Sequence, residues 1–213
     1  LRHAVARQIR GGHVDATRER LGIREEARDL RRCTARKAED PHLRLAAAVE
    51  QRSRDPVGEN AALIAEHLEA AGDLRAAYAW HMRAGAWSGS RDIRAARISW
   101  ERARRVADAL PATDPERTAM RIAPRTARCT TTWRAGLGVA DTGFDELCEL
   151  CRSAGDDMSL AIGMYGQVMA LNCEHRHREA SVLASEQIRL LEESTDGLRG
   201  VAVIHGAATA KLC

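Results

Sequence analysis

The pattern of apolar and polar positions along the chain predicts helices joined by short turns. From residue 59 to residue 110, apolar side chains recur at every third or fourth position, the spacing that places them on one face of a helix. The clearest such stripe ends at Pro111 and consists of Ile93, Ala96, Trp100, Ala103, Val106 and Leu110. Together, the predicted helices and helical faces cover residues 42–51, 59–71, 74–87, 93–110, 144–151, 158–171 and 178–193.

Two Gly-Asp pairs are typical of the junction between consecutive helices. Gly72 and Gly155 each follow an apolar helical stretch, where a glycine ends a helix in the left-handed conformation. Asp73 and Asp156 follow directly, and aspartate is a favoured residue for capping the next helix. We therefore expect tight turns at these two places.

Residues 72–85 and 91–104 form a short internal repeat. They are identical at six of fourteen aligned positions, and the aspartates of the repeat, Asp73 and Asp92, are both expected to cap helices. Alanines at the inward positions allow neighbouring helices to approach closely. The pattern predicts an all-α fold of stacked antiparallel helical hairpins, an α-solenoid in which each hairpin buries its apolar face against its neighbours. An ordinary helical bundle is the alternative.

The chain divides into two regions. Residues 1–42 contain few large apolar side chains and are predicted to be a basic segment of poor order. Residues 43–213 are predicted to form the helical repeat region. Within that region, residues 111–140 are expected to be an irregular spacer or a distorted repeat, although residues 115–128 offer a further helix. A last helix after residue 197 is expected to be truncated at the C-terminus, as in a fragment or a shortened reading frame.

Composition supports the all-α prediction and limits the possible partners. Only seven of 213 side chains are aromatic, and an aliphatic core suits close helix packing better than a sheet. Residues 1–55 hold fourteen Arg and Lys against nine Asp and Glu. The two signs alternate along this segment, which favours a solvated helix face, with nucleic-acid binding as the alternative.

The cysteines and the apolar runs indicate in which cellular compartment the protein is expected. Six irregularly spaced cysteines are interpreted as reduced thiols rather than as a disulfide framework. No apolar run approaches the length of a membrane helix, and no secretory signal begins the chain. We expect a soluble, cytoplasmic protein that makes no membrane contact.

Common catalytic motifs are missing from the sequence. A phosphate-binding loop needs a lysine after a glycine-rich turn, and the only lysines, Lys37 and Lys211, have no such context. The stretch GLGVAD at 136–141 resembles a dinucleotide fingerprint but carries Asp141 in place of the final glycine. No HExxH or GxSxG motif occurs. We expect no catalytic residue and no cofactor.

Two groups of residues offer alternatives to a purely structural role. Cys148, Cys151, Cys173 and His175 are of the types that bind zinc, but Cys148 and Cys151 share an apolar face with Phe144, where packing explains them equally well. Three tryptophans on adjacent predicted helices are candidates to line a groove, although packing is the favoured interpretation. They are Trp80, Trp87 and Trp100.

The stretches AALIAEHLEAAGDLRAAYAWHMRAG and RDIRAARISWERARRVADALP carry a family resemblance. They resemble the tetratricopeptide-like C-terminal region of bacterial signalling proteins that combine an adenylate or guanylate cyclase domain with an AAA-type ATPase domain. LuxR-type regulators have similar helices. The resemblance continues through FDELCELCRSAGDDMSLAIGM and REASVLASEQIRLLEE and covers roughly residues 43–213. It implies a tetratricopeptide-like solenoid without catalytic residues of its own, so that any cyclase or ATPase site of such a parent lies outside this chain.

The sequence accordingly favours a non-catalytic regulatory or interaction module, a fragment of a signalling ATPase or adenylate cyclase. Its expected partner is a protein, a peptide or its own ATPase domain, held on the concave surface that stacking creates. The first alternative is a DNA-associated tail of a LuxR-type regulator that uses residues 1–55. The second is a metal-binding enzyme centred on Cys148, Cys151, Cys173 and His175.

Overall fold

The structure is a computed structural model and describes residues 40–52 and 58–193. Within these ranges all regular elements are helical, which confirms the all-α prediction. The short 3-10 helices η1 and η2 span Trp133–Ala135 and Val139–Asp141. The α-helices are α2 (Pro41–Arg52), α3 (Ala61–Ala70), α4 (Leu74–Ser88), α5 (Ile93–Ala109), α6 (Arg117–Thr131), α7 (Phe144–Ala154), α8 (Asp157–Cys173) and α9 (His177–Glu193).

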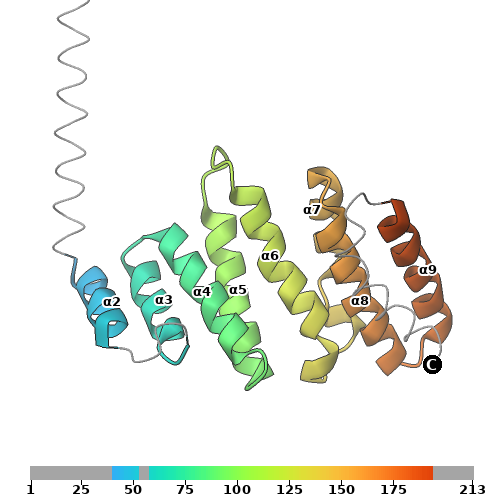
Figure 1. The fold of residues 1–213 in the computed structure, drawn as a ribbon, viewed down its shortest axis with the longest axis horizontal. Helices are drawn as coiled ribbons and strands as arrows, with labels where there is room; N and C mark the ends of the chain where they lie inside the picture. Colours follow the sequence, from blue (N-terminus) through green and yellow to red (C-terminus); the bar gives the residue numbers. More distant parts are fainter. Residues whose placement is uncertain (1–39, 53–57, 194–213) are drawn as a thin grey trace, which may run out of the picture.

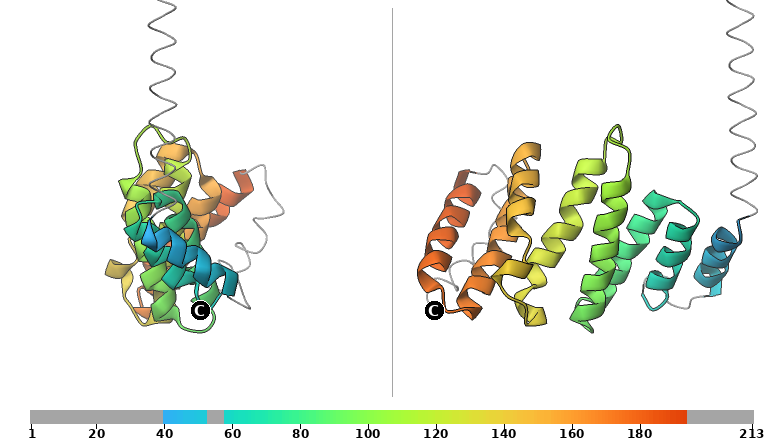
Figure 2. Two further views of the ribbon diagram at one scale, coloured as in Figure 1. Left: turned by 90° about the vertical axis from the view of Figure 1, so that its left-hand side faces the viewer. Right: turned by 180° about the vertical axis from the view of Figure 1, so that it is seen from behind.

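The helices form a row in which sequence neighbours are also spatial neighbours (Figures 1 and 2). Each helix from α2 to α6 packs against the next, α8 packs against α6, α7 and α9, and α7 also contacts α6. The predicted stacking of helical hairpins is therefore present. The basic segment falls almost entirely on residues 1–39, and the predicted last helix falls after residue 197. Both lie outside the described residues.

Both Gly-Asp junctions have the predicted geometry. Gly72 and Gly155 adopt left-handed φ values of 75° and 66° at the ends of α3 and α7. The Asp73 carboxylate accepts a hydrogen bond from the Ala76 backbone N–H, and Asp156 accepts the corresponding bond from Ser159. Each junction thus satisfies backbone donors that the helix start would leave unpaired.

The internal repeat places equivalent residues in equivalent positions. Asp92 caps α5 as Asp73 caps α4, accepting hydrogen bonds from the N–H groups of Arg94 and Ala95. Ala77 and Ala96 are completely buried, which brings α4 close to both of its neighbours. The repeat therefore encodes two successive helices of the row, as predicted.

The three candidate tryptophans pack against neighbouring residues, two of them over glycines, rather than lining a groove. Trp100 of α5 lies over Gly85 of α4, and Trp87 of α4 lies over Gly58, so closely that a Cβ on either glycine would overlap the indole ring. Trp80 is buried in the cluster formed by α2, α3 and α4. Packing therefore accounts for these three side chains, as the favoured interpretation held.

The further helix offered at residues 115–128 is confirmed, whereas the irregular spacer is wrong for residues 117–131, which form the regular helix α6. Pro124 lies inside it, although proline removes one helical hydrogen bond. Pro124 is buried, and next to it the side chains of Arg125 and Thr126 donate to the backbone carbonyls of Arg121 and Ile122. Residues 111–116 and residues 132–143, the latter with η1 and η2, retain the irregular character.

Candidate functional site

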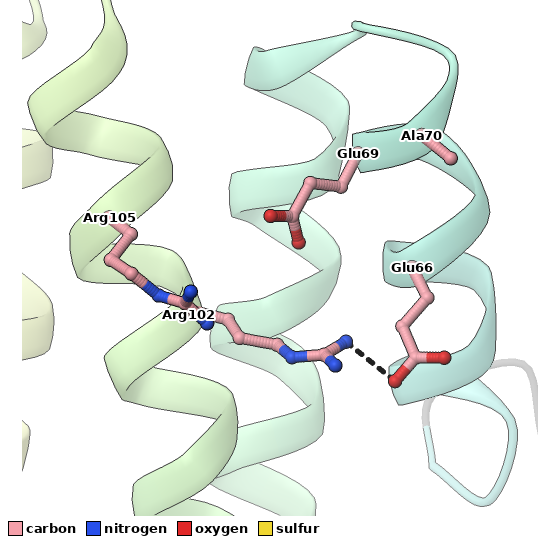
Figure 3. Close-up of a pocket in the computed structure, with 5 residues that line it drawn as sticks. All are labelled: Glu66, Glu69, Ala70, Arg102 and Arg105. Carbon is pink, nitrogen blue, oxygen red and sulfur yellow. Dashed lines mark hydrogen bonds and ion pairs between the residues drawn. The ribbon is translucent and has the colours of Figure 1, made fainter.

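A charged groove lies between α3 and α5, with α4 behind it (Figure 3). Because α4 packs against both α3 and α5, the two outer helices flank it and present their free faces on the same side. The groove has a volume of about 500 Å³ and is open to solvent. It is lined by Glu66, Glu69 and Ala70 of α3 and by Arg102 and Arg105 of α5.

The helical spacing of α5 explains why its arginines reach the groove. Its alanine-rich face, with Ala96 and Ala103, is buried against the neighbouring helices, which leaves Arg102 and Arg105 on the exposed side. Arg102 spans the groove, and its guanidinium donates to the Glu66 carboxylate at 2.5 Å. Arg105 is exposed and makes no ion pair with any described residue.

Glu69 connects the groove to the core through a buried histidine. His81 of α4 is only 1% exposed, and its Nε2–H donates to the Glu69 carboxylate at 3.0 Å. Since a carboxylate only accepts, the neutral ring carries its proton on Nε2, and Nδ1 is buried with no partner among the described residues. A second proton on Nδ1 would have no acceptor there. Burial accordingly lowers the pKa of His81 below its ordinary 6.5, although the hydrogen bond to Glu69 opposes this.

The His81 environment predicts a pH-dependent stability. A histidine whose pKa is lowered by folding binds its proton more readily in the unfolded chain. Its contribution to the free energy of unfolding is therefore complete above about pH 6.5 and declines as the pH falls. The loss is at most about 1.4 kcal/mol per pH unit. We expect urea unfolding between pH 7.5 and pH 5 to show a smaller decline for His81→Gln, which retains a donor for Glu69 but does not titrate. Identical pH profiles for the two proteins would contradict the assignment.

The arginine-rich face of α6 supports the groove helix α5 from the opposite side. Arg125 is 4% exposed and donates to Asp108 of α5 at 2.9 Å and to Glu146 of α7 at 2.7 Å. Arg121 also donates to Asp108, at 2.8 Å. Two turns earlier on α5, Glu101 forms ion pairs with Arg104 and Arg128. This network of opposite charges joins α5, α6 and α7 in addition to the apolar contacts that α6 makes with both neighbours.

The structure does not bring the four zinc candidates together. Cys148 and Cys151 are buried in a cluster with Leu147 on α7, and burial raises the pKa of Cys151 to about 12, which keeps its thiol protonated. Cys173 is the last residue of α8 and His175 lies in the turn after it. Both are exposed, and the length of α8 separates them from the end of α7. Among the described residues, no group of three or more His, Cys, Asp or Glu side chains is arranged to hold a metal ion.

The GLGVAD stretch forms no phosphate-binding turn. Its first glycine, Gly136, ends η1 in the left-handed conformation, and the stretch continues into η2. The backbone N–H of Gly138 donates to Asp141 at 3.2 Å, and that of Val139 donates to Glu174 at 2.7 Å. Two carboxylates thus already occupy the donors that a phosphate would need.

Sequence reasoning missed the charged groove. Its four ionic residues are arranged in pairs three positions apart on two helices, Glu66 with Glu69 and Arg102 with Arg105. That spacing places each pair on one helix face, but an exposed charged face is common and gives no sign of which other helix lies opposite. The sequence shows the acidic pair and the basic pair, but it does not show that the two pairs face each other.

None of the described helices combines the length and the apolar character that crossing a membrane requires. Comparison of the chain with protein-family models, with curated proteins and with solved structures finds no match.

Proposed function

We propose that the chain is a non-catalytic interaction module that binds a peptide or a partner protein in the groove between α3 and α5. The observation that carries this proposal is the groove itself, in which two rigid helices expose carboxylates on one side and guanidinium groups on the other. Such a surface recognises an extended segment that carries both signs of charge.

The contacts within the groove are suited to exchange. The pair between Arg102 and Glu66 is partly solvent-exposed, with side-chain exposures of 32% and 48%, and such pairs stabilise a protein only slightly. A ligand carboxylate can replace Glu66 as the partner of Arg102 at little cost, and the unpaired Arg105 adds a second donor group. A lysine or arginine of the ligand then pairs with the released Glu66.

The resemblance to tetratricopeptide-like regions supports the same role, because such solenoids bind segments of other proteins on their concave surface. By that resemblance, the chain is a cytoplasmic regulatory part of an ATPase-linked cyclase or a LuxR-type regulator, and its partner is a peptide or its own ATPase domain. The DNA-binding alternative depends on residues 1–55, most of which lie outside the described ranges, and it stays a prediction.

Selection of peptides from a random library on the full chain tests the proposal. We expect enriched peptides to carry both acidic and basic residues. Each groove variant, Arg102→Glu or Arg105→Glu, should weaken their binding about tenfold, roughly 1.4 kcal/mol. Arg75→Glu is the matched control, because Arg75 lies on α4 and pairs with Asp114 and Glu116 away from the groove, and it should leave binding unchanged.

Three results would contradict the proposal. The first is equal weakening by the groove variants and by Arg75→Glu, and the second is the enrichment of no peptide at all. The third is formation of cyclic AMP from ATP by the purified chain, which would show catalysis by a chain to which we assign none.

A further inference from the structure

Two histidines from different helices meet at the N-terminal end of the described row. The Nδ1 atoms of His42 on α2 and His67 on α3 lie 3.2 Å apart, and the ring centroids are 5.4 Å apart. His42 is exposed and His67 is partly exposed, so that water and ions reach both rings. Neither residue belongs to the groove between α3 and α5.

Both rings are held by regular helices rather than by loops. His42 is the second residue of α2, and its backbone N–H donates to the Asp40 carboxylate at 2.8 Å, which fixes the first helical turn. His67 lies in the last turn of α3. The two helices are packed together through Ala46 of α2 and the α3 side chain of Ile64. Folding therefore places the two nitrogens face to face before any ligand arrives.

The distance between the two nitrogens suits a shared metal ion. Imidazole nitrogens bind Zn²⁺ at about 2.0–2.1 Å, so that two ligands of one ion lie about 3.3 Å apart in tetrahedral and about 2.9 Å apart in octahedral coordination. The observed 3.2 Å falls between these values. The direct alternative is a hydrogen bond between the rings, which needs one Nδ1–H and one bare Nδ1.

We propose that His42 and His67 together bind one divalent transition-metal ion through their Nδ1 atoms. The described residues offer no third His, Cys, Asp or Glu ligand at this place, so water completes the coordination shell. Imidazole ligands suit Cu²⁺ and Zn²⁺, and Cu²⁺ binds more tightly of the two. Two protein ligands on a preformed scaffold make this an open and reversible site.

The bound ion acts as a clamp between α2 and α3. Unfolding or detachment of α2 separates the two rings, so the ion binds the docked state in preference to the detached state and stabilises it by mass action. The clamp is independent of the function proposed for the groove.

Titration of the full chain, freed of metal by a chelator, with CuCl₂ and separately with ZnCl₂ tests the site. We expect calorimetry to show a site for one ion that His42→Ala and His67→Ala each abolish. Hydrogen exchange of residues 41–52 should slow when the ion is added to the unchanged protein but not when it is added to either variant. Because both side chains are accessible, the variants should retain the helical circular dichroism of the unchanged protein.

The second histidine pair provides a matched control. His175 and His177 also contact each other, with centroids 5.8 Å apart, but their rings meet edge to face at the start of α9, where His177 is the first residue. His177→Ala should leave the site intact. The proposal is overturned if the ion still binds after either His42→Ala or His67→Ala, if His177→Ala abolishes binding, or if neither metal binds at concentrations up to about 1 mM.

Discussion

Replacing Gly166 with alanine is expected to destabilise the protein by about 3 kcal/mol. Gly166 lies on α8 where that helix crosses α6, and an added Cβ would lie 2.5 Å from the backbone oxygen of Cys129 and 2.7 Å from the Cα of Thr130. These are backbone atoms of another helix, so relief of the overlap requires the two helices to separate. Separation would open the buried contact between α6 and α8.

Helix propensity alone predicts the opposite sign. In an exposed helix, alanine is about 1 kcal/mol more favourable than glycine, so a loss of stability would reveal the close approach of the two backbones. Gly163→Ala is the matched control, because Gly163 lies on the same helix but its added Cβ would meet Cδ2 of the Leu147 side chain. The end of a side chain can rotate away, and we expect a much smaller effect.

Chemical denaturation of both variants measures the difference. If Gly166→Ala were as stable as the unchanged protein, or if Gly163→Ala were equally destabilised, the contact between α6 and α8 would not be the cause.

Replacing Asp108 with alanine is expected to cost about 3 kcal/mol. Asp108 accepts hydrogen bonds from Arg104, Arg121 and Arg125, and Arg125 is 4% exposed. Although partial burial opposes ionisation, the hydrogen bonds from Arg125 and Arg121 hold the pKa of Asp108 below its usual 3.8. Without this carboxylate, the buried guanidinium of Arg125 retains only one charged partner, Glu146, which is largely exposed, and the backbone carbonyl of Arg121. A buried charge that has lost most of its opposite charge strongly destabilises the folded state.

A double variant distinguishes loss of the ion pair from general damage. Removing both partners in Asp108→Ala with Arg125→Met should destabilise the protein by less than the sum of the two single variants, because no buried charge is then left unpaired. Glu116→Ala is the control, since Glu116 makes an exposed pair with Arg75 that solvent screens, and its effect should be too small to measure. Additive single effects would show that Asp108 and Arg125 do not act as a pair.

The local signals in the sequence predicted much of the fold. Gly72 with Asp73 and Gly155 with Asp156 form the expected junctions, because left-handed glycine and aspartate caps depend on a few neighbouring residues. The α5 stripe is buried as its spacing predicted, with Trp100 and Ala103 inside. These features require only backbone geometry and a 3.6-residue period.

The sequence offered a helix at residues 115–128 but favoured a spacer there, because polar residues interrupt the buried face of α6. Arg125 and Thr126 occupy positions inside the row, where sequence patterns favour aliphatic residues. Arg125 is tolerated there only because Asp108 lies seventeen residues before it and Glu146 twenty-one residues after it. Pro124 also indicated that a helix would be interrupted at this point, which is not the case.

The sequence by itself determined that the described chain is helical, where most of its helices begin and end, and which faces of the helices other than α6 are buried. Each of these properties is set by residues within a few positions of one another. Only the tertiary structure decided which charged faces meet, and it brought Glu66 opposite Arg102, Asp108 against Arg125 and His42 onto His67. A helix face does not specify its partner, because the spacing of its residues fixes their direction around one axis, whereas the packing of several helices fixes what lies in that direction.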